Sequence, residues 1–184
     1  MVSTRQAADD AERHPQPPLV PPCEQGGTRE AVDAAAESNL ALTYERLGRH
    51  EQAMCMQRDV YSGYLKLHGE ENERTLITAI NYATSLTDRK RFEEAKALLR
   101  KNMPVTRRVL GESHHLTLRM RTIYASALYM DSGATLGDLR EAVTTLEDVE
   151  RIARRVLGGA HPLTVKIAKY LHNARASSAA RESK

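Results

Sequence analysis

Apolar residues recur every three or four positions along most of this chain, with polar residues between them. This spacing places the apolar side chains on one face of an α-helix. Between residues 73 and 110 it predicts two helices, at about 73–88 and 91–110, joined by a short polar stretch. The apolar positions are Leu76, Ile80, Ala83 and Leu86 in the first helix, and Phe92, Ala95, Leu98 and Leu99 in the second.

The same two-helix pattern recurs along the chain. A glycine is followed six residues later by a threonine, and an alanine precedes the glycine by 16 residues, in each of three repeats. The third repeat holds five extra residues at about 131–137, where a turn is expected. The matching positions are Ala53, Gly69 and Thr75, then Ala95, Gly111 and Thr117, then Ala142, Gly158 and Thr164.

The junctions between repeats carry helix stop and start signals. We expect each junction glycine to end a helix in the left-handed conformation. Asn72, His114 and His161 stand three residues later, where a helix N-cap is expected, and asparagine suits that position especially well. Pro162 then falls at a first helical position, where its missing N–H costs nothing.

Two-helix units of this kind cannot bury their apolar faces alone, so neighbouring units must stack. We therefore predict an all-α fold, a right-handed α-solenoid of stacked antiparallel helix pairs. The expected pairs are 34–48 with 50–67, 73–88 with 91–110, and 115–131 with 138–157, followed by a lone helix at 162–176. The solenoid would span 34–176, between a disordered, proline-rich tail at 1–33 and a disordered tail at 177–184.

Composition and charge narrow the functional classes. The 184 residues include no tryptophan and one phenylalanine, and no apolar run approaches the ~20 residues that a membrane-spanning helix needs. Residues 1–30 show no apolar core of a signal peptide, and two cysteines make no disulfide framework, so a cytoplasmic protein is expected. Residues 1–33 carry a net charge of −3, whereas 151–184 carry +7.

Enzymatic chemistry is not indicated. No glycine-rich phosphate loop, zinc cluster or nucleophile motif appears, so we expect no catalytic activity, no cofactor and no metal. His114 and His115 are adjacent and would point apart on a helix, unlike a metal-binding pair one turn apart. Cys55 aligns with small residues, which favours a packed thiol over a nucleophile.

The helix-turn-helix unit with this glycine, alanine and tyrosine spacing resembles the tetratricopeptide repeat. The 42-residue period and the junction Leu157-Gly-Gly-Ala-His-Pro-Leu-Thr-Val165 resemble the kinesin light chain and nephrocystin branch of that family. The stretches Asn81-Tyr-Ala83 and Arg91-Phe-Glu-Glu-Ala95 add to the likeness, which covers about 38–175.

This resemblance implies a protein-interaction scaffold that binds a short linear peptide in a concave groove. In that family an asparagine on the first helix of each pair holds the peptide backbone. Asn39 and Asn81 match it here, and the later repeats have Ile123 and Tyr170 instead. One helical turn earlier stand Ala35, Ile77, Arg119 and Lys166.

We therefore expect a protein or peptide ligand with acidic residues around an apolar anchor, and no membrane partner. Two alternatives remain open at this point. The chain could be an accessory repeat domain of a larger enzyme or signalling protein, or it could bind nucleic acid through its basic C-terminal end. Nucleic acid is the less favoured ligand, because RNA-reading helical repeats have a different period and a base-reading code. Asn39 and Asn81 could also bond only within the solenoid.

Overall fold

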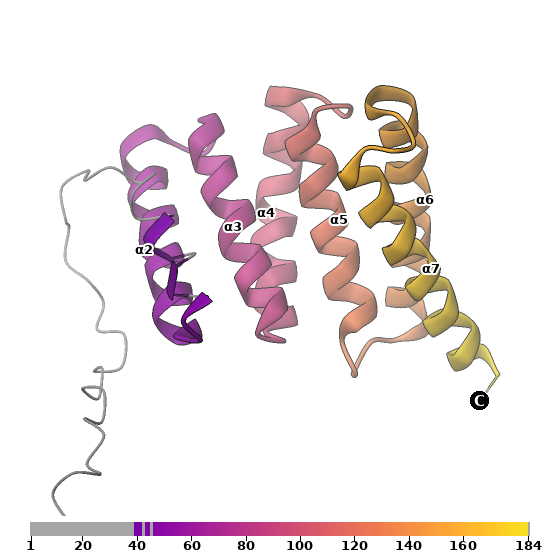
Figure 1. Cartoon of the computed structure of the whole chain (residues 1–184). Helices are drawn as coiled ribbons and strands as arrows, with labels where there is room; N and C mark the ends of the chain where they lie inside the picture. Colours follow the sequence, from indigo (N-terminus) through magenta and orange to yellow (C-terminus); the bar gives the residue numbers. More distant parts are fainter. Residues whose placement is uncertain (1–38, 42, 45, 184) are drawn as a thin grey trace, which may run out of the picture.

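We analysed a computed structural model of the whole chain, which describes residues 39–41, 43–44 and 46–183. Every regular element among these residues is an α-helix (Figure 1). The residues 39–41, 43–44 and 46 are helical and precede Gly48. Six further helices follow, and they are α2 (His50–His68), α3 (Glu73–Asp88), α4 (Phe92–Leu110), α5 (His115–Met130), α6 (Leu136–Leu157) and α7 (Pro162–Glu182).

The helix starts follow from local chemistry that the sequence predicted. The side chains of Asn72, His114 and His161 each accept a hydrogen bond from the backbone N–H two residues later, which confirms all three N-caps. Thr135 and Asp138 form a reciprocal capping box at the start of α6, where the stretch with the five extra residues ends.

The junction glycines end helices as predicted, but their backbone conformation differs from the predicted left-handed helical one. Gly69, Gly111 and Gly158 all have positive φ, between 79° and 86°. Their ψ values, between 158° and 175°, place them in the extended region with positive φ and not in the left-handed helical region. That region is essentially restricted to glycine, so the need for glycine is stricter than a left-handed cap would impose.

Two expectations at the edges of the fold were wrong. Helix α7 continues to Glu182, six residues beyond the predicted end of the solenoid at 176. Cys55 takes part in a disulfide and is not a free packed thiol. The only other cysteine, Cys23, lies outside the described residues, as does the tail predicted at 1–33.

The helices form two layers (Figure 1). Consecutive helices pack against each other, and α3, α5 and α7 also contact one another in a row, which we call the inner layer. The backbones of the described helices α2, α4 and α6 do not approach each other as closely. An array whose members touch in one layer and separate in the other curves toward the touching layer, as a solenoid of helix pairs does.

One apolar cluster runs along this array. It joins Ile80 of α3, Leu99 of α4, Leu128 of α5, Leu146 of α6 and Ile167 of α7, all of them fully buried. Each helix therefore buries its face against the next repeat, which is the packing that the sequence period predicted. In the part of the chain that the structure describes, no helix is long and apolar enough to cross a membrane.

Candidate functional site

The predicted site residues lie on the first helix of each pair. Ile77 and Asn81 are on α3, Arg119 and Ile123 on α5, and Lys166 and Tyr170 on α7. Because α3, α5 and α7 contact one another in sequence, these six positions line one face of the inner layer. We call them the inner-face residues. Asn39 lies in the helical residues before Gly48 and is exposed.

The apolar members of this set share one cluster. Ile123 is 8% exposed and belongs to the core, while Ile77 and Tyr170 are partly buried against it. The Tyr170 ring meets the Tyr129 ring edge-on, with 6.1 Å between their centroids. We call Ile123, Tyr129 and Tyr170 the apolar seat between α5 and α7, in which the two tyrosines are partly exposed and Ile123 is buried.

The positive charges beside this seat are not neutralised by ion pairs. Arg119 is exposed and makes no hydrogen bond or ion pair with any described residue. Protein atoms around it nevertheless remove part of its hydration, which lowers the pKa of the guanidinium. The Nζ of Lys166 lies 5.5 Å from the centroid of the Tyr170 ring, a cation–π contact that holds the ammonium over the apolar seat.

The two asparagines differ in what the structure places around them. Asn81 is half-buried, and its amide makes no hydrogen bond with the described residues, so bonding within the solenoid does not account for it. An unoccupied side-chain amide can donate and accept at once. The backbone carbonyl of Asn39 accepts a hydrogen bond from Thr43 Oγ1, and its side chain is exposed.

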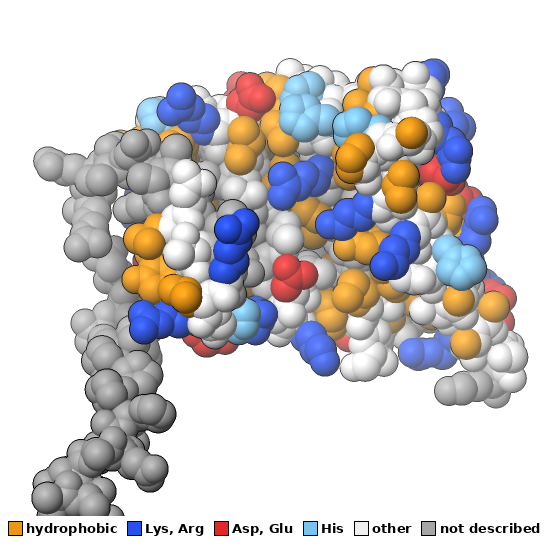
Figure 2. Space-filling view, viewed as in Figure 1, with side chains coloured by type: hydrophobic (Ala, Val, Ile, Leu, Met, Phe, Trp, Pro, Cys, Tyr) orange, Lys and Arg blue, Asp and Glu red, His pale blue; other side chains and the backbone are white. Residues whose placement is uncertain are grey.

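Figure 2 shows this side of the molecule. Lys and Arg side chains are interspersed with apolar and neutral ones over α3, α5 and α7, and acidic side chains are scarcer there. The surface therefore combines positive charge with apolar contact area, as the sequence pattern suggested for this face.

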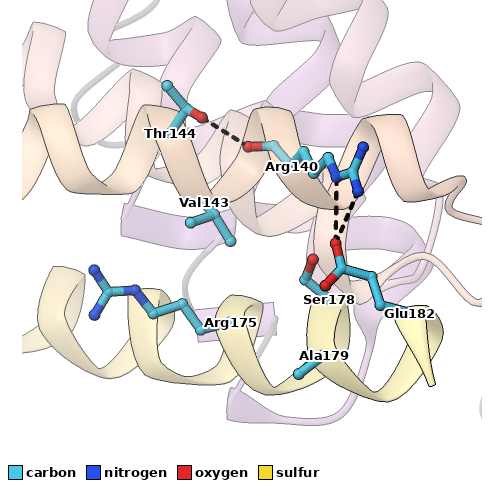
Figure 3. A pocket seen from close by; sticks show the side chains of 7 residues that line it. All are labelled: Arg140, Val143, Thr144, Arg175, Ser178, Ala179 and Glu182. Atoms are coloured by element: carbon cyan, nitrogen blue, oxygen red, sulfur yellow. Dashed lines mark hydrogen bonds and ion pairs between the residues drawn. The ribbon is translucent and has the colours of Figure 1, made fainter.

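A groove lies elsewhere, between α6 and α7 (Figure 3). It measures about 380 Å³, and Val143 and Ala179 supply its apolar surface. Its charges are already paired, because Arg140 hydrogen-bonds to Glu182 and Arg175 pairs with a glutamate of α6. This groove includes none of the predicted site residues.

Tyr129 is not one of the predicted site residues. Burial raises the pKa of the Tyr129 phenol, and a hydrogen bond with Asn173 opposes that rise. Its contact with Tyr170 crosses from one repeat to the next, so no local motif could have revealed it. Among the described residues, no three His, Cys, Asp or Glu side chains gather as a metal site would require.

Comparison with known proteins identifies the type of fold. The family model described as tetratricopeptide repeat matches residues 33–100. Comparison with curated protein sequences found no significant match.

Among the solved structures that resemble this chain are three crystal structures. Two come from Podosopora anserina and are described as kinesin light chain nearly identical TPR-like repeats, one of them a variant with a single substitution. The variant is 23% identical to this chain with a TM-score of 0.65, and the match covers 82% of this chain and 68% of the variant's chain. The other is 21% identical with a TM-score of 0.66, covering 86% and 73%. BtubC (BKLC) from P. vanneervenii is 17% identical with a TM-score of 0.60, covering 82% and 62%.

These likenesses and the helix arrangement confirm the predicted all-α solenoid of tetratricopeptide type. At such low identity, the structural likeness establishes the fold alone. Tetratricopeptide repeats in general mediate protein–protein interactions, and what this particular chain binds must be argued from its own residues.

Proposed function

We propose that this protein is a scaffold whose inner face captures a short linear segment of another protein, with acidic residues around a large apolar anchor. The observation that carries the proposal is an uncompensated cation, Arg119, beside the apolar seat of Ile123 and Tyr170. The likeness to structures described as kinesin light chain repeats and the 42-residue period of the sequence support a kinesin-light-chain-like subtype.

Each part of such a ligand has a counterpart on this face. The apolar anchor fits the seat between α5 and α7, where an aromatic edge and an aliphatic side chain meet. The free amide of Asn81 can pair with a peptide N–H and C=O, which must be satisfied when a backbone is covered. Arg119 and Lys166 stand one turn from Ile123 and Tyr170 and attract the acidic flanks.

The expected affinity is modest. Exposed ion pairs contribute about 0.2–1 kcal/mol each, and salt screens them over about 10 Å at 0.1 M. A ligand held by one apolar anchor and a few exposed ion pairs is expected to have a dissociation constant of roughly micromolar. Binding should weaken as salt rises, because the charged flanks lose more than the anchor does.

The test begins by selecting binders of the full-length protein from a displayed library of random 12-residue peptides. The affinities of the selected peptides are then measured by titration. Selected peptides should pair one large apolar residue with Asp or Glu. Reversal of charge at Arg119 and Lys166 together should weaken binding more than Asn81→Ala at low salt, and less at high salt. Reversal at Lys66 and Lys101, exposed on α2 and α4, is the matched control and should change little.

Two results would overturn the proposal. Selected peptides without acidic residues, or with affinities that ignore salt and the inner-face variants, would place the ligand site elsewhere. Circular dichroism of each variant should match the native protein, so that a loss of binding reports the surface and not the fold.

A further inference from the structure

In α3 and α5, one face packs against the second helix of the same pair. The matching face of α7, which we call its outer side, differs from these two. Aligning α3, α5 and α7 on their shared threonine identifies four positions that pack against the second helix of each pair. In α3 these are Leu76, Ile80, Ala83 and Leu86, and in α5 they are Leu118, Thr122, Ala125 and Leu128, all buried. In α7 they are Val165, Lys169, His172 and Arg175, all exposed.

Helix α7 is still a regular inner-layer helix on its other side. Thr164, Ile167, Leu171 and Ala174 are buried against the solenoid. A further outer-layer helix packed on α7, as α4 packs on α3 and α6 on α5, would bury Lys169 and His172 without partners, at a large desolvation cost. The continuous apolar contact between neighbouring helices, which we call the apolar seam, therefore ends at α7. The outer side of α7 is polar, as the surface of a capping element must be.

Solvation alone does not explain why these residues carry a single sign of charge. Solvated protein surfaces ordinarily mix both signs. The one acidic residue of α7, Glu182, pairs with Arg140 of α6, and Arg175 pairs with Glu147. Lys169 and His172 have no hydrogen bond or ion pair with any described residue.

The acidic residues of α6 offer no compensation either, because each one is already engaged. Two bond to hydroxyl groups and three pair with arginines. The pairings are Asp138 with Thr135, Glu141 with Tyr124, Glu147 with Arg175, Asp148 with Arg121 and Arg151, and Glu150 with Arg154.

These basic residues continue the charge of the inner face. Lys166, Lys169, His172 and Arg175 follow each other at intervals of three residues, so neighbouring side chains are about 5–6 Å apart at their Cβ atoms. Intervals of three fall short of a full helical turn, so the row winds around α7 from the inner face toward the α6–α7 groove. We call these four residues the α7 ridge. Figure 2 shows basic side chains among apolar and neutral ones on the surface of α7.

We propose that the α7 ridge is an extension of the peptide site, on which an acidic stretch flanking the inner-face ligand lies across Lys169 and His172. This inference rests on the proposed function and adds two residues and a direction to it. The acidic stretch leaves the apolar seat at Tyr170, passes Lys166 and turns over the end of the solenoid.

A peptide fits the ridge better than a nucleic acid. Nucleic-acid binding at physiological salt depends on many phosphate contacts, and base stacking needs accessible aromatic rings. The ridge offers a single row of basic residues, and α7 carries one tyrosine, which is too few rings to stack successive bases. The ridge is also continuous with an apolar seat suited to a side-chain anchor.

The experiment uses the full chain and three fluorescent peptides in low-salt buffer near pH 6.5, because salt screens exposed ion pairs. The core peptide is Ser-Asp-Glu-Phe-Glu-Asp-Ser. The other two peptides extend this core at both ends, one with four Glu and one with four Gln. The Glu-extended peptide should bind about 2- to 30-fold more tightly than the Gln-extended one, the gain from two exposed ion pairs.

The double substitution Lys169→Glu with His172→Glu should abolish that gain and leave the affinity for the Gln-extended peptide within about twofold. Charge reversal at His68 and Lys101, exposed on α2 and α4, is the matched control and should retain the gain. Both variants should keep the native circular dichroism spectrum.

The outcomes separate the two proposals. An equal gain from the Glu extension in the ridge variant, or no gain in the native protein, overturns the ridge assignment and leaves the inner-face site standing. If no peptide binds the native protein, the proposed function itself fails. A single-stranded oligonucleotide that binds through Lys169 and His172 more tightly than the Glu-extended peptide would overturn the choice of a peptide ligand.

Discussion

The substitution Ile167→Ala tests whether α7 closes the apolar core of the solenoid. Ile167 is 0% exposed and belongs to the main core cluster, where α7 packs on α5 and α6. The change removes three carbon atoms, worth about 0.8 kcal/mol each in transfer free energy, and the remaining cavity adds to that loss. Because an end helix can relax toward its neighbours, we expect a destabilisation of about 2–4 kcal/mol.

The location of the loss is as informative as its size. Each repeat in a solenoid contacts only its neighbours, so damage at one end should stay local. Hydrogen exchange measured by mass spectrometry should show a large loss of amide protection in α7, a smaller one in α6 and almost none in α3. Val165→Ala is the matched control, since Val165 lies two residues away and is 56% exposed, and it should change stability by less than about 0.5 kcal/mol.

Two results would refute this reasoning. If Val165→Ala costs as much as Ile167→Ala, the outer side of α7 is covered by something in solution and does not end the seam. If Ile167→Ala lowers protection equally in α3 and α7, the solenoid unfolds as one cooperative unit and the local account fails.

Three further predictions concern stability. Gly158→Ala should cost about 1–3 kcal/mol in chemical denaturation, because its φ of 86° and ψ of 158° lie in a region that excludes side chains, whereas Gly159→Ala should cost much less. Hydrogen bonds from Arg121 and then from a second arginine hold the pKa of Asp148 below its ordinary value, so its contribution to stability is present above about pH 4 and is lost as pH falls through the depressed pKa. Asp148→Asn should therefore be less stable at pH 7 and lose less on acidification, measured by urea unfolding at several pH values. The Tyr124 hydroxyl bridges an arginine of α4 and a glutamate of α6, so Tyr124→Phe should cost about 0.5–1.5 kcal/mol in urea unfolding, and no loss would show that the bridge contributes nothing.

Local sequence signals were sufficient for the helices themselves. The expected helix at 73–88 is α3 to the residue, and the N-caps at Asn72, His114 and His161 all form. Caps, turn glycines and apolar periods act within a few residues, so they can be read without knowing the rest of the chain. The period also specified stacking, because units with exposed apolar faces must bury them against each other.

Other features depended on the arrangement of repeats in space. The edge-on contact of Tyr129 with Tyr170 and the desolvation of the unpaired Arg119 arise where neighbouring repeats meet. The extended conformation of Gly158 follows from how one repeat must be oriented on the next.

The end of the solenoid shows both kinds of information at once. The residues at the outer positions of α7 are fixed by the sequence, but periodicity alone aligns Val165 and Lys169 with buried leucine and isoleucine. Only the tertiary structure shows that no described helix covers these positions, and exposure decides whether a cation costs free energy or offers a charge to a partner. The sequence by itself therefore determined the repeating unit, and packing between units determined which of its faces remain open.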